Sequence, residues 1–186
     1  MKHTGLKVTG VDKYSDKADY NMDFMSYTKA RHMNFDVVFC SHVIEHQRNV
    51  GEFLDRIYDV LSDDGVLIIS APNHPAETLI EGHINSFIFP LFLQQMIHAG
   101  FDCKSGKYFS LIENSFIVSK AKDFKLEERS ENGYQWTQVN KDYGSPSAGS
   151  TTTQQTTEEA NNTWTADWAT AAQLSSKAAV TLSTTA

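Results

Sequence analysis

The chain has 186 residues, of which 40% are hydrophobic, and its formal net charge is -7 at pH 7. This negative balance argues against non-specific nucleic-acid binding, which normally needs a basic surface. No run approaches the roughly 20 apolar residues of a transmembrane helix, and the first ten residues lack the apolar core of a signal peptide, so we expect a cytoplasmic protein without a membrane or nucleic-acid partner.

Two short segments near the beginning of the chain carry candidate ligand-binding residues. Leu6–Val11 is an apolar run that predicts a strand, and Asp12 follows it. A carboxylate at a strand end can accept hydrogen bonds from both hydroxyls of a ribose, although a solvated turn residue is the alternative. Further along, Asp23 and Phe24 pair a carboxylate with an aromatic ring, a combination that suits an adenine.

The stretch from Asn34 to Asn73 predicts a strand, a helix and a second strand. Phe35–Cys40 and Val66–Ser70 are apolar runs of strand length. Val50–Leu61 lies between them and carries apolar residues at helical spacing, with Asn49 as a suitable N-cap. Such a unit is most simply a crossover in a parallel sheet.

Polar residues follow both of these strands. Ser41 and His42 come after the first strand, and Asn73 comes after the second. Because ligands of open α/β sheets bind at the carboxyl ends of the strands, we expect the functional site there.

The rest of the chain divides into an ordered part and a tail. Pro90 begins a predicted helix that ends at Gly100. Lys107–Ile112 and Ser115–Lys120 predict an antiparallel hairpin that turns at Glu113-Asn114. Residues 1–125 are therefore expected to form one domain. Residues 126–186 are rich in Thr, Ser, Ala, Gln and Asn, and are expected to form a mostly disordered, low-complexity tail.

With these elements placed, the chain resembles the class I S-adenosylmethionine-dependent methyltransferases, in particular their small-molecule branch. The resemblance is carried by Val11-Asp12, Asp23-Phe24, FDVVFCSHVIEH at 35–46, LSDDGVLIISAPN at 61–73, GHINSF at 82–87, AGF at 99–101 and the closing hairpin. It covers roughly residues 6–122.

The resemblance implies an α/β, Rossmann-like sheet with a reversed last strand and S-adenosylmethionine across the strand ends. Asp12 would hold the ribose, and Asp23 with Phe24 the adenine. Ser41 and His42 would lie at the methionine end. The reaction would be methyl transfer to a small-molecule acceptor whose identity the sequence does not give, with His46, His83 and His42 as candidate bases.

One feature of that family is missing. Its glycine-rich loop follows the first, central strand of the sheet, and nothing before Val11 resembles that strand or loop. We therefore expect a chain that lacks the usual first strand and is truncated at its N-terminus. The alternative is that another segment fills the gap, and Ala179–Thr184 has some β character.

The motif HVIEH at residues 42–46 also matches the H-x-x-E-H pattern of one zinc-peptidase class, which needs both histidines on one helix. Related methyltransferases bind a divalent metal with an E-x-x-E-H arrangement and a further histidine. Here His42 replaces the first glutamate of that arrangement, while Glu45, His46 and His83 are available. We expect instead that these side chains line the pocket without a metal.

Two other functions remain open from the sequence. A degenerate methyltransferase fold could serve as a binding module without catalysis, as the missing glycine loop suggests. A fragment of a dinucleotide-binding oxidoreductase would also place Asp12 on a ribose. The oligomeric state is not visible in the sequence.

Overall fold

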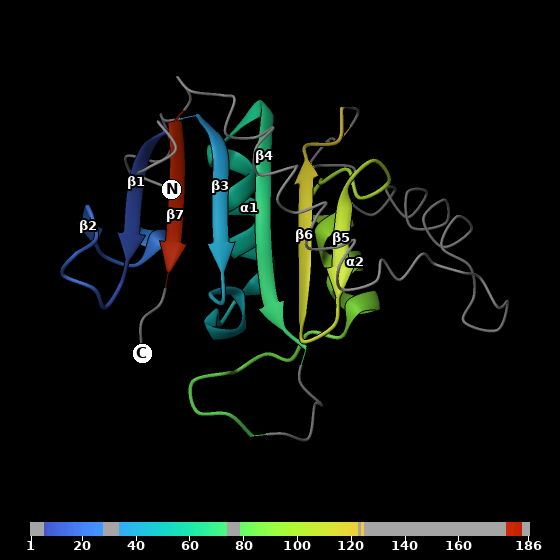
Figure 1. Ribbon diagram of the computed structural model, residues 1–186, viewed down its shortest axis with the longest axis horizontal. Coiled ribbons are helices and arrows are strands. Elements are labelled where there is room, and N and C mark those ends of the chain that lie inside the picture. Colours follow the sequence, from blue (N-terminus) through green and yellow to red (C-terminus); the bar gives the residue numbers. More distant parts are fainter. Residues whose placement is uncertain (1–5, 28–33, 74–78, 123, 125–177, 184–186) are drawn as a thin grey trace, which may run out of the picture.

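A computed structural model of the chain describes residues 6–27, 34–73, 79–122, 124 and 178–183. The strands of this part are β1 (Lys7–Asp12), β2 (Tyr20–Asn21), β3 (Phe35–Ser41), β4 (Leu61–Pro72), β5 (Lys107–Ser110), β6 (Glu113–Ser119) and β7 (Ala178–Ser183). The helices are α1 (Val50–Val60) and α2 (Phe89–His98), with short 3-10 turns η2 (Phe24–Ser26) and η4 (Ile44–His46). All seven strands join one sheet in the order β2-β1-β7-β3-β4-β6-β5, as Figure 1 shows.

The predicted strand–helix–strand unit is confirmed. β3 and β4 pair in parallel, with Cys40 opposite Ile69, and α1 connects them. The Asn49 side chain caps α1 by accepting a hydrogen bond from the backbone N–H of Glu52 at 3.3 Å. The chain passes from α1 directly into β4 at Leu61, so the second strand begins five residues before the predicted Val66.

The C-terminal hairpin of the family is also present, but its turn lies earlier than predicted. β6 runs antiparallel to both β4 and β5, and Leu111 and Ile112 occupy the tip instead of Glu113-Asn114. The reason is that Asn114 is buried in the strand, where it donates to the Phe87 carbonyl at 2.7 Å and accepts from the Ser110 hydroxyl at 2.6 Å.

The central strand comes from the C-terminal end of the described chain. β7 pairs in parallel with β1 on one side, from Lys7–Ala178 to Asp12–Ser183, and with β3 on the other side. The α/β fold class with its reversed last strand is confirmed, and the position expected to lack a strand is filled by this segment (Figure 1).

This finding corrects the assignment of residues 178–183 to the tail. The physical reason is that insertion satisfies the hydrogen-bonding edges of β1 and β3, which would otherwise stay open. It also buries Val180 and Leu182, which are 0% and 2% exposed. The remaining residues assigned to the tail, 126–177 and 184–186, lie outside the described part of the chain.

The main core lies between the sheet and its two helices, which lie behind the sheet in Figure 1. Phe53, Leu54 and Ile57 of α1 pack there together with Val180 and Leu182 of β7. Cys40 and Cys103 are buried and free, and burial raises the pKa of both thiols. Neither helix of the described residues has the length and apolar character needed to span a membrane.

The central position of β7 can be tested with Leu182→Ala. Removing a fully buried leucine side chain from the core is expected to lower the free energy of unfolding by about 2–5 kcal/mol, measured by urea denaturation of the full chain. Leu79→Ala is the matched control, because Leu79 is 96% exposed. Equal stability of the two variants would contradict the insertion of β7.

Candidate functional site

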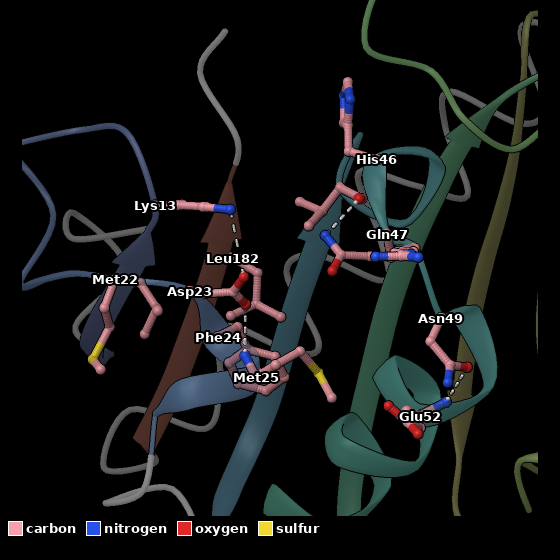
Figure 2. A pocket seen from close by; sticks show the side chains of 13 residues that line it. Lys13, Met22, Asp23, Phe24, Met25, His46, Gln47, Asn49, Glu52 and Leu182 are labelled. Carbon is pink, nitrogen blue, oxygen red and sulfur yellow. Dashed lines mark hydrogen bonds and ion pairs between the residues drawn. The ribbon is translucent and has the colours of Figure 1, made fainter.

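A cavity of about 580 Å³ opens at the carboxyl ends of β1 and β7. Its volume lies within the range of small-molecule sites. Figure 2 shows side chains from several segments around it. It is lined by Val11, Lys13, Met22, Asp23, Phe24, Met25, Val43, His46, Gln47, Arg48, Asn49, Glu52 and Leu182. Three of the predicted site residues, Asp23, Phe24 and His46, therefore share one cavity.

Asp23 and Phe24 are held by the short turn η2. The Asp23 carboxylate accepts a hydrogen bond from the Met25 N–H at 2.9 Å and lies 3.7 Å from the Lys13 ammonium. Phe24 is buried, and its ring meets Phe53 edge-on with centroids 5.8 Å apart. The cavity thus offers a carboxylate beside an aromatic side chain and apolar walls, among them Leu182 (Figure 2).

Asp12 has a different environment from the one predicted. It ends β1 and is only 3% exposed. Its Oδ1 accepts hydrogen bonds from the N–H groups of Tyr14 at 2.8 Å and Ser15 at 2.9 Å. It is not among the side chains that line the cavity, although its neighbours Val11 and Lys13 are. One oxygen of this carboxylate therefore fixes the turn after β1, and a ribose contact by Asp12 stays a prediction.

Ser41 and His42 lie at the end of β3. The two hydroxyls of Ser41 and Ser70 are 3.0 Å apart, which joins the ends of β3 and β4. His42 has a φ of 55°, a left-handed conformation that is uncommon for a non-glycine residue. Its N–H donates to the Ser70 carbonyl at 3.1 Å. This backbone turn directs the His42 ring toward two carboxylates.

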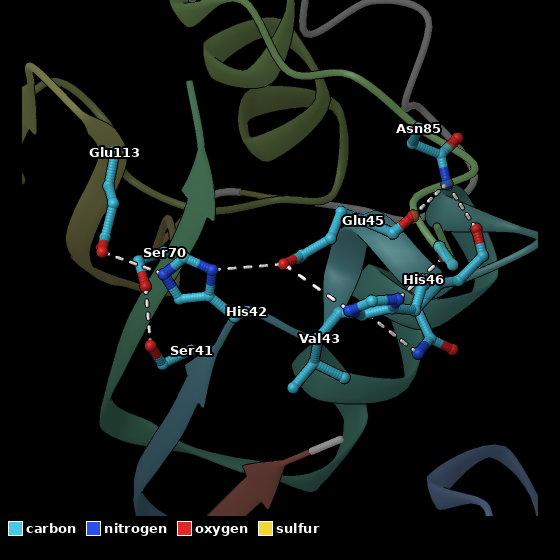
Figure 3. Close-up of polar contacts among 10 residues, drawn as sticks. Ser41, His42, Val43, Glu45, His46, Ser70, Asn85 and Glu113 are labelled. Atoms are coloured by element: carbon cyan, nitrogen blue, oxygen red, sulfur yellow. Dashed lines mark hydrogen bonds and ion pairs between the residues drawn. The ribbon is translucent and has the colours of Figure 1, made fainter. Parts of the chain in front are cut away.

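Figure 3 shows the His42 ring between Glu45 and Glu113. Its Nδ1 lies 3.4 Å from Oε1 of Glu45, and its Nε2 lies 2.9 Å from Oε1 of Glu113. Both ring nitrogens of His42 thus face acidic groups. Glu113 begins β6, and it was not predicted as a site residue.

Glu45 is fully buried, and neither of its carboxylate oxygens has a hydrogen-bond partner. Its Oε1 lies 3.4 Å from Nδ1 of His42 and 3.8 Å from Nε2 of His46. A buried carboxylate without hydrogen bonds is costly unless a cation compensates it. The described residues thus leave this carboxylate with histidines alone for compensation.

His46 and His83 face the same carboxylate. His46 Nδ1 lies 2.8 Å from the Gly82 carbonyl, and because a carbonyl only accepts, Nδ1 must carry the proton and leave the Nε2 lone pair of the neutral ring open. The His83 ring meets the His46 ring edge-on, with centroids 4.9 Å apart. One ligand atom each from Glu45, His46 and His83 lies within 4.8 Å of the others, so this set could hold a divalent cation.

The geometry excludes the peptidase interpretation of HVIEH. His42 has a left-handed backbone and η4 begins only at Ile44, so the two histidines do not share a face of one α-helix. The alternative of a metal held by Glu45, His46 and His83 gains support, because the His46 ring is oriented by a carbonyl on its other nitrogen, as is usual for metal-bound histidines. Nitrogen-rich ligand sets favour zinc and similar ions over magnesium.

Sequence reasoning missed Glu113, Lys13 and Leu182. Glu113 could have been found, because the first residue of a reversed strand lies at the same edge as the carboxyl ends of its parallel neighbours. Lys13 directly follows Asp12 and could also have been considered. Leu182 lies in the segment Ala179–Thr184, whose β character made it an alternative, but its place in the cavity wall depends on pairing across a long stretch of chain.

Comparisons with known proteins indicate the family of the chain. A family model described as a methyltransferase domain matches residues 1–109, which contain most of the segments that carry the resemblance. No curated protein matches the chain in sequence.

Two similar solved structures are both methyltransferases. One is Burkholderia thailandensis 1,6-didemethyltoxoflavin-N1-methyltransferase with bound 1,6-didemethyltoxoflavin and S-adenosylhomocysteine, at 15% identity and a TM-score of 0.46 over 65% of this chain and 74% of that one. The other is human N-acetylserotonin methyltransferase in complex with S-adenosylmethionine, at 13% identity and a TM-score of 0.40 over 62% of this chain and 41% of that one.

The cation-binding capacity of the cluster can be tested by thermal unfolding of the EDTA-treated chain. Zn²⁺ at a hundred times its Kd is expected to stabilise the folded chain by about 2.7 kcal/mol. Glu45→Gln should abolish the rise in Tm. Glu113→Gln is the matched control, since Glu113 contacts His42 but lies outside the three-residue set. An unchanged Tm of the parent chain would support the original expectation of a pocket without metal.

Proposed function

Because the matched stretch spans residues 1–109 of 186, the chain belongs to the methyltransferase-domain family, and on this premise we propose that it methylates a small-molecule acceptor. S-adenosylmethionine is the cofactor of this family. The observation that carries the proposal is the cavity at the strand ends, which leads through His46 to the histidine cluster of His42, Glu45, His46 and His83.

The residues of the cavity fit S-adenosylmethionine by their chemistry. Asp23 offers acceptor oxygens to donor groups of the nucleoside. Phe24 and Leu182 supply apolar surface for an adenine ring. The wall that contains His46 would face the methionine end, because His46 belongs to both the cavity and the cluster. Asp12, Ser41 and His42 stay proposed cofactor ligands, with Asp12 engaged in a turn.

Among the predicted bases we assign the main role to His46 in the metal-free cluster. Both nitrogens of His42 lie within 3.4 Å of carboxylate oxygens. Nδ1 of His46 is occupied by the Gly82 carbonyl, and its Nε2, 3.8 Å from Oε1 of Glu45, is the basic nitrogen. His83 lies against the His46 ring and would hold it in place.

The chemistry follows from these positions. When bound, S-adenosylmethionine supplies an electrophilic methyl group on a sulfonium centre. For a hydroxyl acceptor, His46 would take the hydroxyl proton, so that the acceptor oxygen could receive the methyl group that S-adenosylmethionine would supply. The chain's own contribution is therefore positioning of the two reactants and removal of one proton.

A binding module without catalysis is the alternative from another functional class. No segment before Val11 resembles the glycine-rich loop of the family, which supports this alternative. A dinucleotide-binding oxidoreductase has less support, because the family match is to a methyltransferase domain.

Cofactor binding is tested by calorimetric titration of the full chain with S-adenosylhomocysteine. Asp23→Asn is expected to raise the Kd by roughly tenfold or more, since hydrogen bonds to charged groups contribute about 1.5–3 kcal/mol. Asparagine can still cap η2, so the turn should survive. Asp63→Asn, whose side chain is fully exposed, should bind like the parent chain. Absence of saturable binding by the folded parent chain would refute the proposed cofactor.

Catalysis is tested by transfer of a labelled methyl group from S-adenosylmethionine into a small-molecule extract. His46→Gln is expected to lower the rate by about 10²–10⁴-fold, as for loss of a general base, while S-adenosylhomocysteine binding persists. Binding without transfer in the parent chain would favour the non-catalytic module.

A further inference from the structure

Exposed apolar side chains gather in two segments at the carboxyl edge of the sheet. Of the eight large apolar side chains that are exposed in the described part of the chain, six lie at 79–91 or 111–112. They are Leu79, Ile84, Ile88, Leu91, Leu111 and Ile112. Concentrated exposure of this kind marks a binding surface more often than scattered single residues do.

The first segment is fixed beside Glu45. The backbone N–H groups of Ile84 and Asn85 both donate to the Glu45 carbonyl, at 3.0 and 3.1 Å. The Asn85 side chain donates to the Gln47 carbonyl at 2.6 Å, as Figure 3 shows beside the cluster. Ile84 is nevertheless 61% exposed. Its position is thus specified by hydrogen bonds while its side chain remains in solvent.

The second segment is fixed beside His42. Asn73 at the end of β4 donates from its N–H to the Ile112 carbonyl at 2.9 Å and from its side chain to the Leu111 carbonyl at 3.0 Å. The next residue, Glu113, contacts His42. Ile112 is 84% exposed, although turns normally carry Gly, Asn, Asp or Ser. Packing therefore does not explain these two apolar residues at the tip.

Ile84 is thus tied by its backbone to Glu45 of the histidine cluster, and Leu111 and Ile112 directly precede Glu113, which contacts His42. We infer that the methyl acceptor is an amphipathic small molecule, with a hydroxyl at the histidine cluster and an apolar body against these three side chains. This inference rests on the proposed methyl transfer and names the chemical class of its acceptor.

The acidic groups of the histidine cluster further restrict the chemical class of the methyl acceptor. Glu45 and Glu113 both face His42, so a phosphate or carboxylate on the acceptor would meet two negative groups. An uncharged hydroxyl such as a phenol avoids this repulsion. The net charge of -7 likewise disfavours an anionic membrane surface as the occupant.

The test measures binding of 4-alkylphenols, from 4-methylphenol to 4-octylphenol, to the full chain loaded with S-adenosylhomocysteine. Burial of each further methylene strengthens binding up to about fourfold, and partial coverage by the flanking side chains should give at least a tenfold gain across the series. Ile84→Asn and Ile112→Asn are expected to reduce that gain to about threefold or less. Tyr14→Asn is the control and should preserve it, because Tyr14 is 63% exposed and lies outside both segments.

The outcomes separate the inference from the function on which it rests. If the chain binds S-adenosylhomocysteine but its affinity for 4-alkylphenols does not rise with alkyl length, the amphipathic acceptor is refuted and the proposed function is not. An undiminished rise in affinity across the alkylphenol series in both Ile84→Asn and Ile112→Asn would also refute the amphipathic acceptor. Depletion of the protein by phosphatidylcholine vesicles without phenol binding would replace the small molecule by a lipid surface. Loss of S-adenosylhomocysteine binding in the parent chain would instead refute the proposed function.

Discussion

The parallel pairing of β7 with β1 and β3 is the interaction on which the rest of the structure depends. Each of these neighbours would otherwise present an open hydrogen-bonding edge in the middle of the sheet. By joining them, β7 makes one continuous sheet and aligns the ends of β1 and β3. The cavity opens at this edge, and Leu182 of β7 forms part of its wall. Completion of the fold and formation of the proposed cofactor cavity are therefore coupled through one short strand.

The buried Glu45 imposes the second constraint. A carboxylate in the protein interior is tolerated only where positive charge or hydrogen bonding compensates it. In the described chain, the side chains gathered around this carboxylate are those of His42, which precedes η4, of His46, the last residue of η4, and of His83, which follows Gly82. The left-handed backbone of His42 and the Gly82 carbonyl on His46 hold the rings toward it. This arrangement also supplies the proposed base His46 and a set of possible metal ligands.

Local patterns in the sequence were sufficient to predict the elements that depend on residues close to one another in the chain. The apolar runs of β3 and β4, the helical spacing of Phe53, Leu54 and Ile57, and the Asn49 cap each report interactions within a few residues. They predicted the β3–α1–β4 unit and its polar edge. The reversed last strand was predicted from the family resemblance. The match to a methyltransferase domain agrees with that resemblance.

Long-range pairing could not be predicted in the same way. Residues 178–183 form a short segment that is rich in small side chains. Its β character made it an alternative, but its place in the sheet is evident only once β1 and β3 are seen to lack a partner between them. The turn at Leu111-Ile112 was misplaced because Glu113-Asn114 look like turn residues, whereas Asn114 is fixed by contacts with distant Phe87. The contact of Glu113 with His42 likewise depends on how distant strands align.

Hydrogen–deuterium exchange of the full chain, with and without S-adenosylhomocysteine, tests the coupling of β7 and the cofactor site most directly. Amides in central strands exchange only through large-scale opening. The account predicts slow exchange across residues 178–183 and further slowing when the ligand is present, with a similar response at Asp23–Met25. Exchange of 178–183 at the rate of an unstructured peptide in both conditions would contradict it.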